Sequence, residues 1–144
     1  MEQTDVKKLN QFLKGIYMGV HAYEHFIGKC DDAAIKKVLQ KIQQEHKFSG
    51  IRIAERIQNL GGTPVSDEGF TGSIADFIGK WTSPDKTKEI LEKALLSERT
   101  YAVEKAGKTI KGEISKDNKK LIDDILERNA SHVTLLSEML QKLP

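Results

Sequence analysis

The sequence predicts an all-α protein: a single four-helix bundle domain over residues 1–144, with one long crossover between its second and third helices. Apolar residues recur at three- and four-residue spacing through most of the chain. Capping and stop residues divide this pattern into four long segments. Two of the three connections are short, and the third is long enough to run the length of a bundle.

The first helix is expected over 5–28, with Thr4 as its N-cap. Its apolar stripe consists of Leu9, Leu13, Ile16, Val20, Tyr23 and Ile27. Gly15 and Gly19 interrupt this helix, and each costs about 1 kcal/mol relative to alanine in a helix. We expect them to permit close helix packing. The second helix is expected over 32–60, between an aspartate N-cap at 31 or 32 and a Gly-Gly-Thr-Pro stop.

The third helix is expected over 84–111, since Ser83 and Pro84 form an N-cap followed by a first-turn proline. The fourth is expected over 116–142, with Ser115 as its cap. Short connections predict that the first and second helices, and the third and fourth, form antiparallel hairpins. The long connection then places the second helix parallel to the third.

That long connection contains "GSIADFIGKW", which predicts a short extra helix with four apolar residues on one face. These residues are Ile74, Phe77, Ile78 and Trp81. They either cover the bundle as a lid or form a surface for self-association. Because an exposed apolar face is costly in water, we expect a homodimer, or a higher homo-oligomer, to bury it.

Charge and cysteine content narrow the functional classes. The 23 basic and 21 acidic residues are spread along the chain and give a formal charge of +2, so neither a nucleic-acid nor a membrane partner is expected. The chain has one cysteine and no signal-peptide pattern. A cytoplasmic location is therefore expected.

The stretch "HAYEH" at residues 21–25 matches the His-x-x-Glu-His signature of inverted zinc peptidases. With Val20 at the centre of the apolar stripe and about 100° per residue, Glu24 lies about 40° off centre. His21 and His25 lie about 100° and 140° away, so they point sideways or outward. The chain is also too short to form a peptidase substrate cleft. We expect solvated histidines and no peptidase activity.

Four other stretches carry a family resemblance. "LNQFLKGI", "HKFSGIRIAERIQNLGGTP", "SERTY" and "NASHVTLLSEML" occur in the order and spacing of the four helices of a ferritin-like protein. The chain resembles a small bacterial ferritin-like group of largely unknown function, some members of which are associated with general stress (sigma-B) operons. This resemblance implies a bundle protein of iron or oxidative-stress handling.

Iron-oxidising members of that superfamily hold two metal ions with a Glu from each of two helices and a Glu-x-x-His from each of the other two. By resemblance, the corresponding positions here are Ile16, His46 with Ser49, Glu98, and Asn129 with His132. Most of the glutamates are therefore absent, and the di-iron site is expected to be degenerate.

Hairpin symmetry gives an independent estimate of which residues share a level in the bundle. A turn near residue 114 places Glu98 level with residue 130, and therefore with Asn129 and His132. A turn near residue 30 places His46 level with about residue 14, whereas Glu24 lies roughly 15 Å away along the axis. The expected metal ligands are His46, Glu98 and His132, with Asn129, Glu45 and Glu24 as weaker candidates and Ser49, Tyr17 and Tyr101 as neighbours.

Three interpretations of this cluster remain open. The first is a metal-free layer of hydrogen-bonded polar groups, because buried polar groups must be paired. The second is a site for one iron or zinc ion, since two histidines and a carboxylate suit both metals. The third is a di-iron site that Glu45 and Glu24 complete. The sequence favours at most one metal and no efficient ferroxidase activity. A metal-free structural or interaction module is the alternative function.

Overall fold

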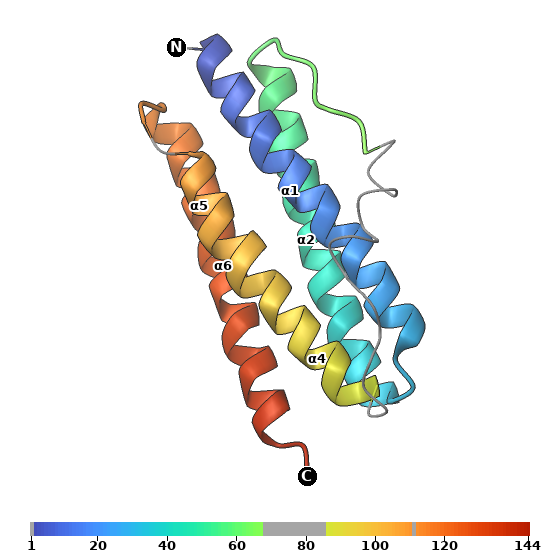
Figure 1. Cartoon of the computed structure of the whole chain (residues 1–144). Helices are drawn as coiled ribbons and strands as arrows, with labels where there is room; N and C mark the ends of the chain where they lie inside the picture. Colours follow the sequence, from blue (N-terminus) through green and yellow to red (C-terminus); the bar gives the residue numbers. More distant parts are fainter. Residues whose placement is uncertain (1, 68–85, 111) are drawn as a thin grey trace.

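The computed structural model describes residues 2–67, 86–110 and 112–144, which form four helical arms packed side by side (Figure 1). The arms consist of α1 (Glu2–Lys29), α2 (Ala33–Asn59), a composite third arm, and α6 (Lys116–Gln141). The third arm comprises α4 (Lys86–Leu96), the π-helix η1 (Ser97–Lys105) and α5 (Ala106–Thr109). The described residues contain no β-strand, so the predicted all-α four-helix bundle is confirmed.

The direction of the arms also follows the prediction. In Figure 1, α1 runs down, α2 runs up, the third arm runs up and α6 runs down. The second arm is therefore parallel to the third, and α2 ends and α4 begins at opposite ends of the bundle. The short helix predicted around Ile74, Phe77, Ile78 and Trp81, and the proline at 84, lie outside the described residues.

The two ends of α2 show how the sequence sets a helix boundary. Asp32 is the N-cap, and its Oδ1 accepts a hydrogen bond of 3.0 Å from the backbone N–H of Ile35. At the other end Gly61 has a φ of +83°, which a glycine adopts without strain. The N–H of Gly62 then reaches the carbonyl of Ile57 at 2.9 Å, as in a Schellman motif.

Two predicted caps are wrong in detail. Thr4 lies inside α1, which begins at Glu2, so it does not cap the helix. Ser115 occupies the N-cap position of α6, but its side chain makes no capping hydrogen bond. The buried carboxylate of Asp5 in α1 holds this turn in another way: its Oδ2 accepts from the Ser115 backbone N–H at 3.2 Å and from Nδ2 of Asn118 at 2.7 Å. A distant carboxylate therefore organises this turn.

The third arm is not the uniform α-helix that was expected over 84–111. It changes to i→i+5 hydrogen bonding at Ser97, which alters the faces that its side chains occupy. Leu96, the last residue of α4, is 60% exposed, while Ser97 and Glu98, the first two residues of η1, are buried. Tyr101, expected on the inner stripe, is 37% exposed.

The expected close packing at Gly15 and Gly19 is also wrong. Within the part of the chain that the structure describes, a Cβ atom placed on either glycine would meet no neighbouring atom within 4 Å. Close packing would require a contacting neighbour, as Gly62 shows, where a Cβ would come within 2.7 Å of a methyl group of Val6. The two glycines of α1 therefore leave open space in front of them.

Two apolar clusters fill the bundle, one toward each end. The cluster near the α1–α2 turn includes Tyr23, Phe26, Leu39, Ile42, Ile90, Leu91 and Leu136. The other cluster includes Leu9, Leu13, Ile16, Ile53, Ile57, Ile122 and Ile125. Between them, at the same level of α2, η1 and α6, lie buried polar residues. The core is therefore divided by a polar layer.

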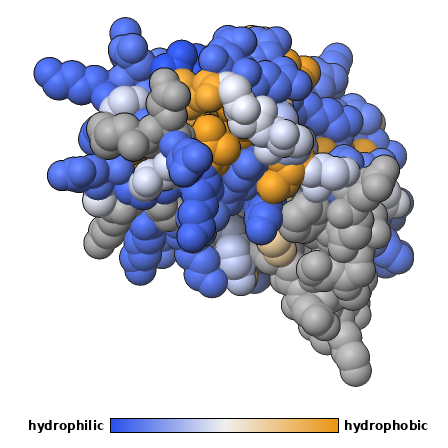
Figure 2. Space-filling model, turned by 90° about the horizontal axis from the view of Figure 1, so that it is seen from above, coloured by the Kyte–Doolittle hydropathy of each residue, from blue (hydrophilic) through white to orange (hydrophobic). Residues whose placement is uncertain are grey.

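The upper end of the bundle presents mainly polar residues (Figure 2). Figure 2, seen from above the bundle of Figure 1, shows hydrophilic residues over most of the visible face and a small hydrophobic group near its centre. Among the described residues, no helix combines the length and hydrophobicity needed to cross a bilayer.

Candidate metal centre

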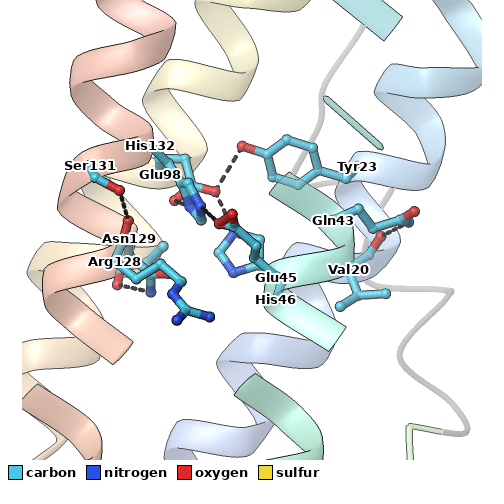
Figure 3. A network of polar contacts seen from close by, with 11 residues as sticks. Val20, Tyr23, Gln43, Glu45, His46, Glu98, Arg128, Asn129, Ser131 and His132 are labelled. Carbon is cyan, nitrogen blue, oxygen red and sulfur yellow. Dashed lines mark hydrogen bonds and ion pairs between the residues drawn. The ribbon is translucent and has the colours of Figure 1, made fainter. Parts of the chain in front are cut away.

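The polar layer brings together residues from three arms. His46 and Ser49 come from α2, Glu98 comes from η1, and Asn129 and His132 come from α6. Each of these residues is at most 4% exposed. The structure therefore gathers the three residues expected as ligands, His46, Glu98 and His132, at one point between the two apolar clusters (Figure 3).

Glu98 is the centre of this layer. Its Oε1 accepts a hydrogen bond of 2.8 Å from the hydroxyl of Tyr23, and Nε2 of His46 pairs with the same oxygen. Its Oε2 lies 3.4 Å from Nδ1 of His132. Because Glu98 has no exposed surface, these three side chains supply the solvation that water would otherwise give its charge.

His132 lies between two carboxylates. While Nδ1 faces Glu98, Nε2 lies 2.6 Å from Oε2 of Glu45, a side chain that is 29% exposed. When His132 is neutral, a proton on Nε2 donated to Glu45 leaves the lone pair of Nδ1 directed toward Glu98. A carboxylate that binds the far nitrogen of a metal-binding histidine fixes its tautomer in this way. Glu45 is therefore placed to orient a ligand rather than to act as one.

The charges of the layer are coupled. Burial acts to raise the pKa of Glu98, but the opposing charge and hydrogen bonds of His46 and His132 lower it from 4.5 to about 2. Burial acts to lower the pKa of His132, but Glu98 and Glu45 raise it above its usual 6.5. Burial and the neighbouring Glu98 charge raise the pKa of Tyr23 well above 10.0, so its hydroxyl stays a donor.

The donor atoms fit one metal ion. One ligand atom each from His46, Glu98 and His132 can be chosen so that all lie within 4.8 Å of one another. No other group of three such residues occurs in the part of the chain that the structure describes. Two imidazole nitrogens and one carboxylate are the donors found around zinc and non-haem iron.

The same donors do not fit two metal ions. Ile16, at one glutamate position of the di-iron pattern, is an apolar residue with 7% exposure, and Asn129 at another is uncharged. Glu98 and Glu45 together carry two negative charges, which balance one divalent ion. A second divalent ion would leave its charge uncompensated in the core, at a cost of several kcal/mol.

Asn129 closes the layer on one side. Its Nδ2 donates a hydrogen bond of 3.0 Å to the carbonyl of Ala102 in η1, which tethers α6 to the π-helix. Its buried Oδ1 has no hydrogen-bond partner among the described residues. A carbonyl oxygen can only accept a hydrogen bond, so the amide atom that faces it must be the nitrogen Nδ2. The other amide atom is therefore the oxygen Oδ1, an acceptor.

Several predicted candidates lie elsewhere. Glu24 and His25 are exposed, and His21 lies with its Nε2 3.8 Å from Asp67, so the "HAYEH" residues form no group around a common point. Glu24 therefore does not complete a di-iron site. Tyr101, by contrast, adjoins the layer: it is 37% exposed, with Nζ of Lys105 4.5 Å from its ring centroid, and it lines the same small cavity as His46, Glu98 and Asn129.

Sequence reasoning missed Tyr23 and the π-helix. Tyr23 was assigned to the apolar stripe, although a fully buried tyrosine hydroxyl needs a partner, and a buried acid in the same bundle offers one. That signal was available in the sequence. No comparable signal marks the change from α4 to η1.

Comparison with known protein families gives one match. The model of a family described as Domain of unknown function (DUF2383) matches residues 4–113, which include α1, α2 and the third arm. No curated protein and no solved structure matches the chain.

Proposed function

The chain belongs to this family of domains of unknown function, and we propose that its bundle core binds one divalent transition-metal ion, iron or zinc, through His46, Glu98 and His132. The observation that carries the proposal is the convergence of two imidazoles and one carboxylate from three arms at a buried point. The placement of Glu45 behind His132 supports it, because metal-binding histidines usually have such a partner.

The π-helix supports a functional rather than a purely architectural role for this layer. Short π segments within α-helices occur frequently at functional sites, and Glu98 is the second residue of η1. Together with the ferritin-like resemblance of the four helices, this favours a ferritin-like protein of iron or oxidative-stress handling. The missing glutamates favour a role without efficient ferroxidase activity.

A metal-free structural or protein-interaction module is the second candidate function. It is favoured by a specific observation: without any metal, both oxygens of Glu98 already have partners in Tyr23, His46 and His132. A buried polar layer with paired groups can persist for this reason alone. The two candidates therefore differ in metal content and not in fold.

Metal analysis distinguishes them. Protein purified without chelators should contain up to one iron or zinc per chain, measured by inductively coupled plasma mass spectrometry. His132→Ala should abolish core binding, because it removes one of three ligands. His25→Ala is the matched control, an exposed histidine whose loss should leave the stoichiometry unchanged.

Anaerobic titration with ferrous iron gives the decisive stoichiometry. We expect saturation at about one ion per chain and slow oxidation when oxygen is added. Saturation at two ions followed by rapid oxidation would refute the single-metal assignment. Absence of any core binding of iron or zinc in the wild-type protein would favour the structural module.

A further inference from the structure

A small cavity adjoins the proposed metal ligands on the side of α1. It has a volume of about 30 Å³ and is lined by buried polar side chains of the layer, including His46, Glu98 and Asn129. A buried water needs about 10–15 Å³ of such space, so the cavity can hold a molecule of two or three non-hydrogen atoms.

The cavity continues outward into a groove. The groove has a volume of about 100 Å³ and includes the exposed residues Gln11 and Lys105 in its walls. The cavity and the groove share Phe12, Gly15, Gly19, Tyr101 and Ala106 as lining residues. A route therefore leads from the surface, between α1 and the π-helix, to the polar layer.

Gly15 and Gly19 form the wall of this route on α1. Because a Cβ at either position would meet no neighbouring atom of residues 2–67, 86–110 or 112–144 within 4 Å, packing of the described helices does not require glycine there. Two glycines in a helix are unfavourable for its stability, and here their effect is to leave the route open. We therefore interpret Gly15 and Gly19 as residues that keep the route open and not as residues needed for helix packing.

The inner end of the route has a free hydrogen-bond acceptor. Oδ1 of Asn129 is buried and lacks a partner among the described residues, and Asn129 lines the cavity. An acceptor in this position is satisfied by a molecule that carries an O–H or N–H group. It cannot be satisfied by a small ligand that only accepts hydrogen bonds.

We propose that the cavity at Asn129 binds a small uncharged hydrogen-bond donor of two or three non-hydrogen atoms, which enters past Gly15 and Gly19 and lies beside Glu98 and His46. This rests on the proposed function in one respect: with a metal bound, the molecule occupies a place next to the ion. Binding in the cavity itself requires only Asn129 and an open route.

The test uses the full chain loaded with Co²⁺, whose visible absorption responds to its ligands, and hydroxylamine as a small donor probe. Hydroxylamine should change the spectrum saturably, and imidazole, which is too large, should not. Asn129→Leu should weaken hydroxylamine binding at least about tenfold, the loss expected for one buried hydrogen bond. Gly19→Leu should slow binding at least tenfold with unchanged cobalt stoichiometry.

Gly28→Leu is the matched control, since Gly28 is a glycine of the same helix whose Cβ would also meet nothing within 4 Å, away from the route. It should leave the rate unchanged. Equal binding of imidazole, an unaltered affinity in Asn129→Leu or an unaltered rate in Gly19→Leu would each overturn the proposal.

Metal-free crystals separate this proposal from the metal site. In the wild type, hydroxylamine should appear within hydrogen-bonding distance of Oδ1 of Asn129 after a short soak, and in Gly19→Leu it should appear only after a much longer soak. A cavity that holds only water after a long hydroxylamine soak of the wild type counts against the proposal. If cobalt does not bind, the proposed function fails while these crystals still decide the cavity. An empty cavity in wild-type crystals would overturn the proposal even if cobalt binds.

Discussion

Acidification of the metal-free protein should remove a stabilisation that depends on the charge of Glu98. Its pKa is about 2 in the folded protein against an ordinary value of 4.5. Because the folded-state pKa is the lower one, the ionised carboxylate stabilises the fold fully above pH 4.5. The stabilisation is lost as the pH falls from 4.5 through 2.

The magnitude follows from the difference between the two pKa values. At about 1.36 kcal/mol per pH unit, it corresponds to roughly 3 kcal/mol in the free energy of unfolding. This is a large part of the 5–15 kcal/mol that is typical of a whole domain. The physical source is the pairing of the buried Glu98 carboxylate with His46 and His132.

Urea unfolding followed by circular dichroism between pH 5 and pH 2 measures this effect in chelator-treated protein. Other carboxylates titrate in the same range, so the relevant quantity is the difference in unfolding free energy between the wild type and Glu98→Gln. That difference should shrink by roughly 3 kcal/mol on acidification. Carbon-13 NMR titration of the Glu98 carboxyl gives the same information if the variant does not fold.

The reasoning would be refuted if the difference stayed constant from pH 5 to pH 2, or if the carboxyl titrated near 4.5. His132 provides a second check with the opposite sign. Its folded-state pKa is raised above 6.5, so its protonated form stabilises the metal-free fold below pH 6.5. This contribution should be lost as the pH rises through the folded-state value.

Three further predictions concern neighbouring groups and association. Glu45→Gln should weaken metal binding about 10- to 100-fold, because it alters the partner of His132. Competition with a chelating dye measures the affinity, and Glu55→Gln on the same helix should leave it unchanged. Tyr23→Phe should lower the unfolding free energy by about 1.5–3 kcal/mol with metal stoichiometry retained; no loss would mean that water reaches Glu98. Sedimentation should show a homodimer, and a monomer at high concentration with Trp81 buried would contradict it.

The fold could be predicted because its boundaries are set by local chemistry. Asp32 and Gly61 act within a few residues of their own positions, so the sequence carries their effect directly. The capping role predicted for the Ser115 side chain is wrong for the opposite reason. The turn before α6 is organised by Asp5, more than a hundred residues away, and no local pattern reveals that contact.

The candidate ligands could be predicted because hairpin geometry determines the height of each residue along the bundle axis. His46, Glu98 and His132 lie together as expected, since rise per residue is nearly constant along α-helices. The π-helix breaks that constancy in η1, and it turned Tyr101 outward. Glycine patterns were equally ambiguous, because Gly15 and Gly19 look the same in sequence whether a neighbour or empty space faces them.

The polar layer reconciles the two candidate functions in energetic terms. In the metal-free protein, the raised pKa of His132 favours its protonated form, and when protonated it separates the carboxylates of Glu98 and Glu45 and compensates their charge. A metal ion would replace that proton and use the same carboxylates for charge balance, since ligand histidines must be neutral. If the metal binds as proposed, a proton and a metal ion would stabilise the same layer in turn, and release of the metal would leave the core folded.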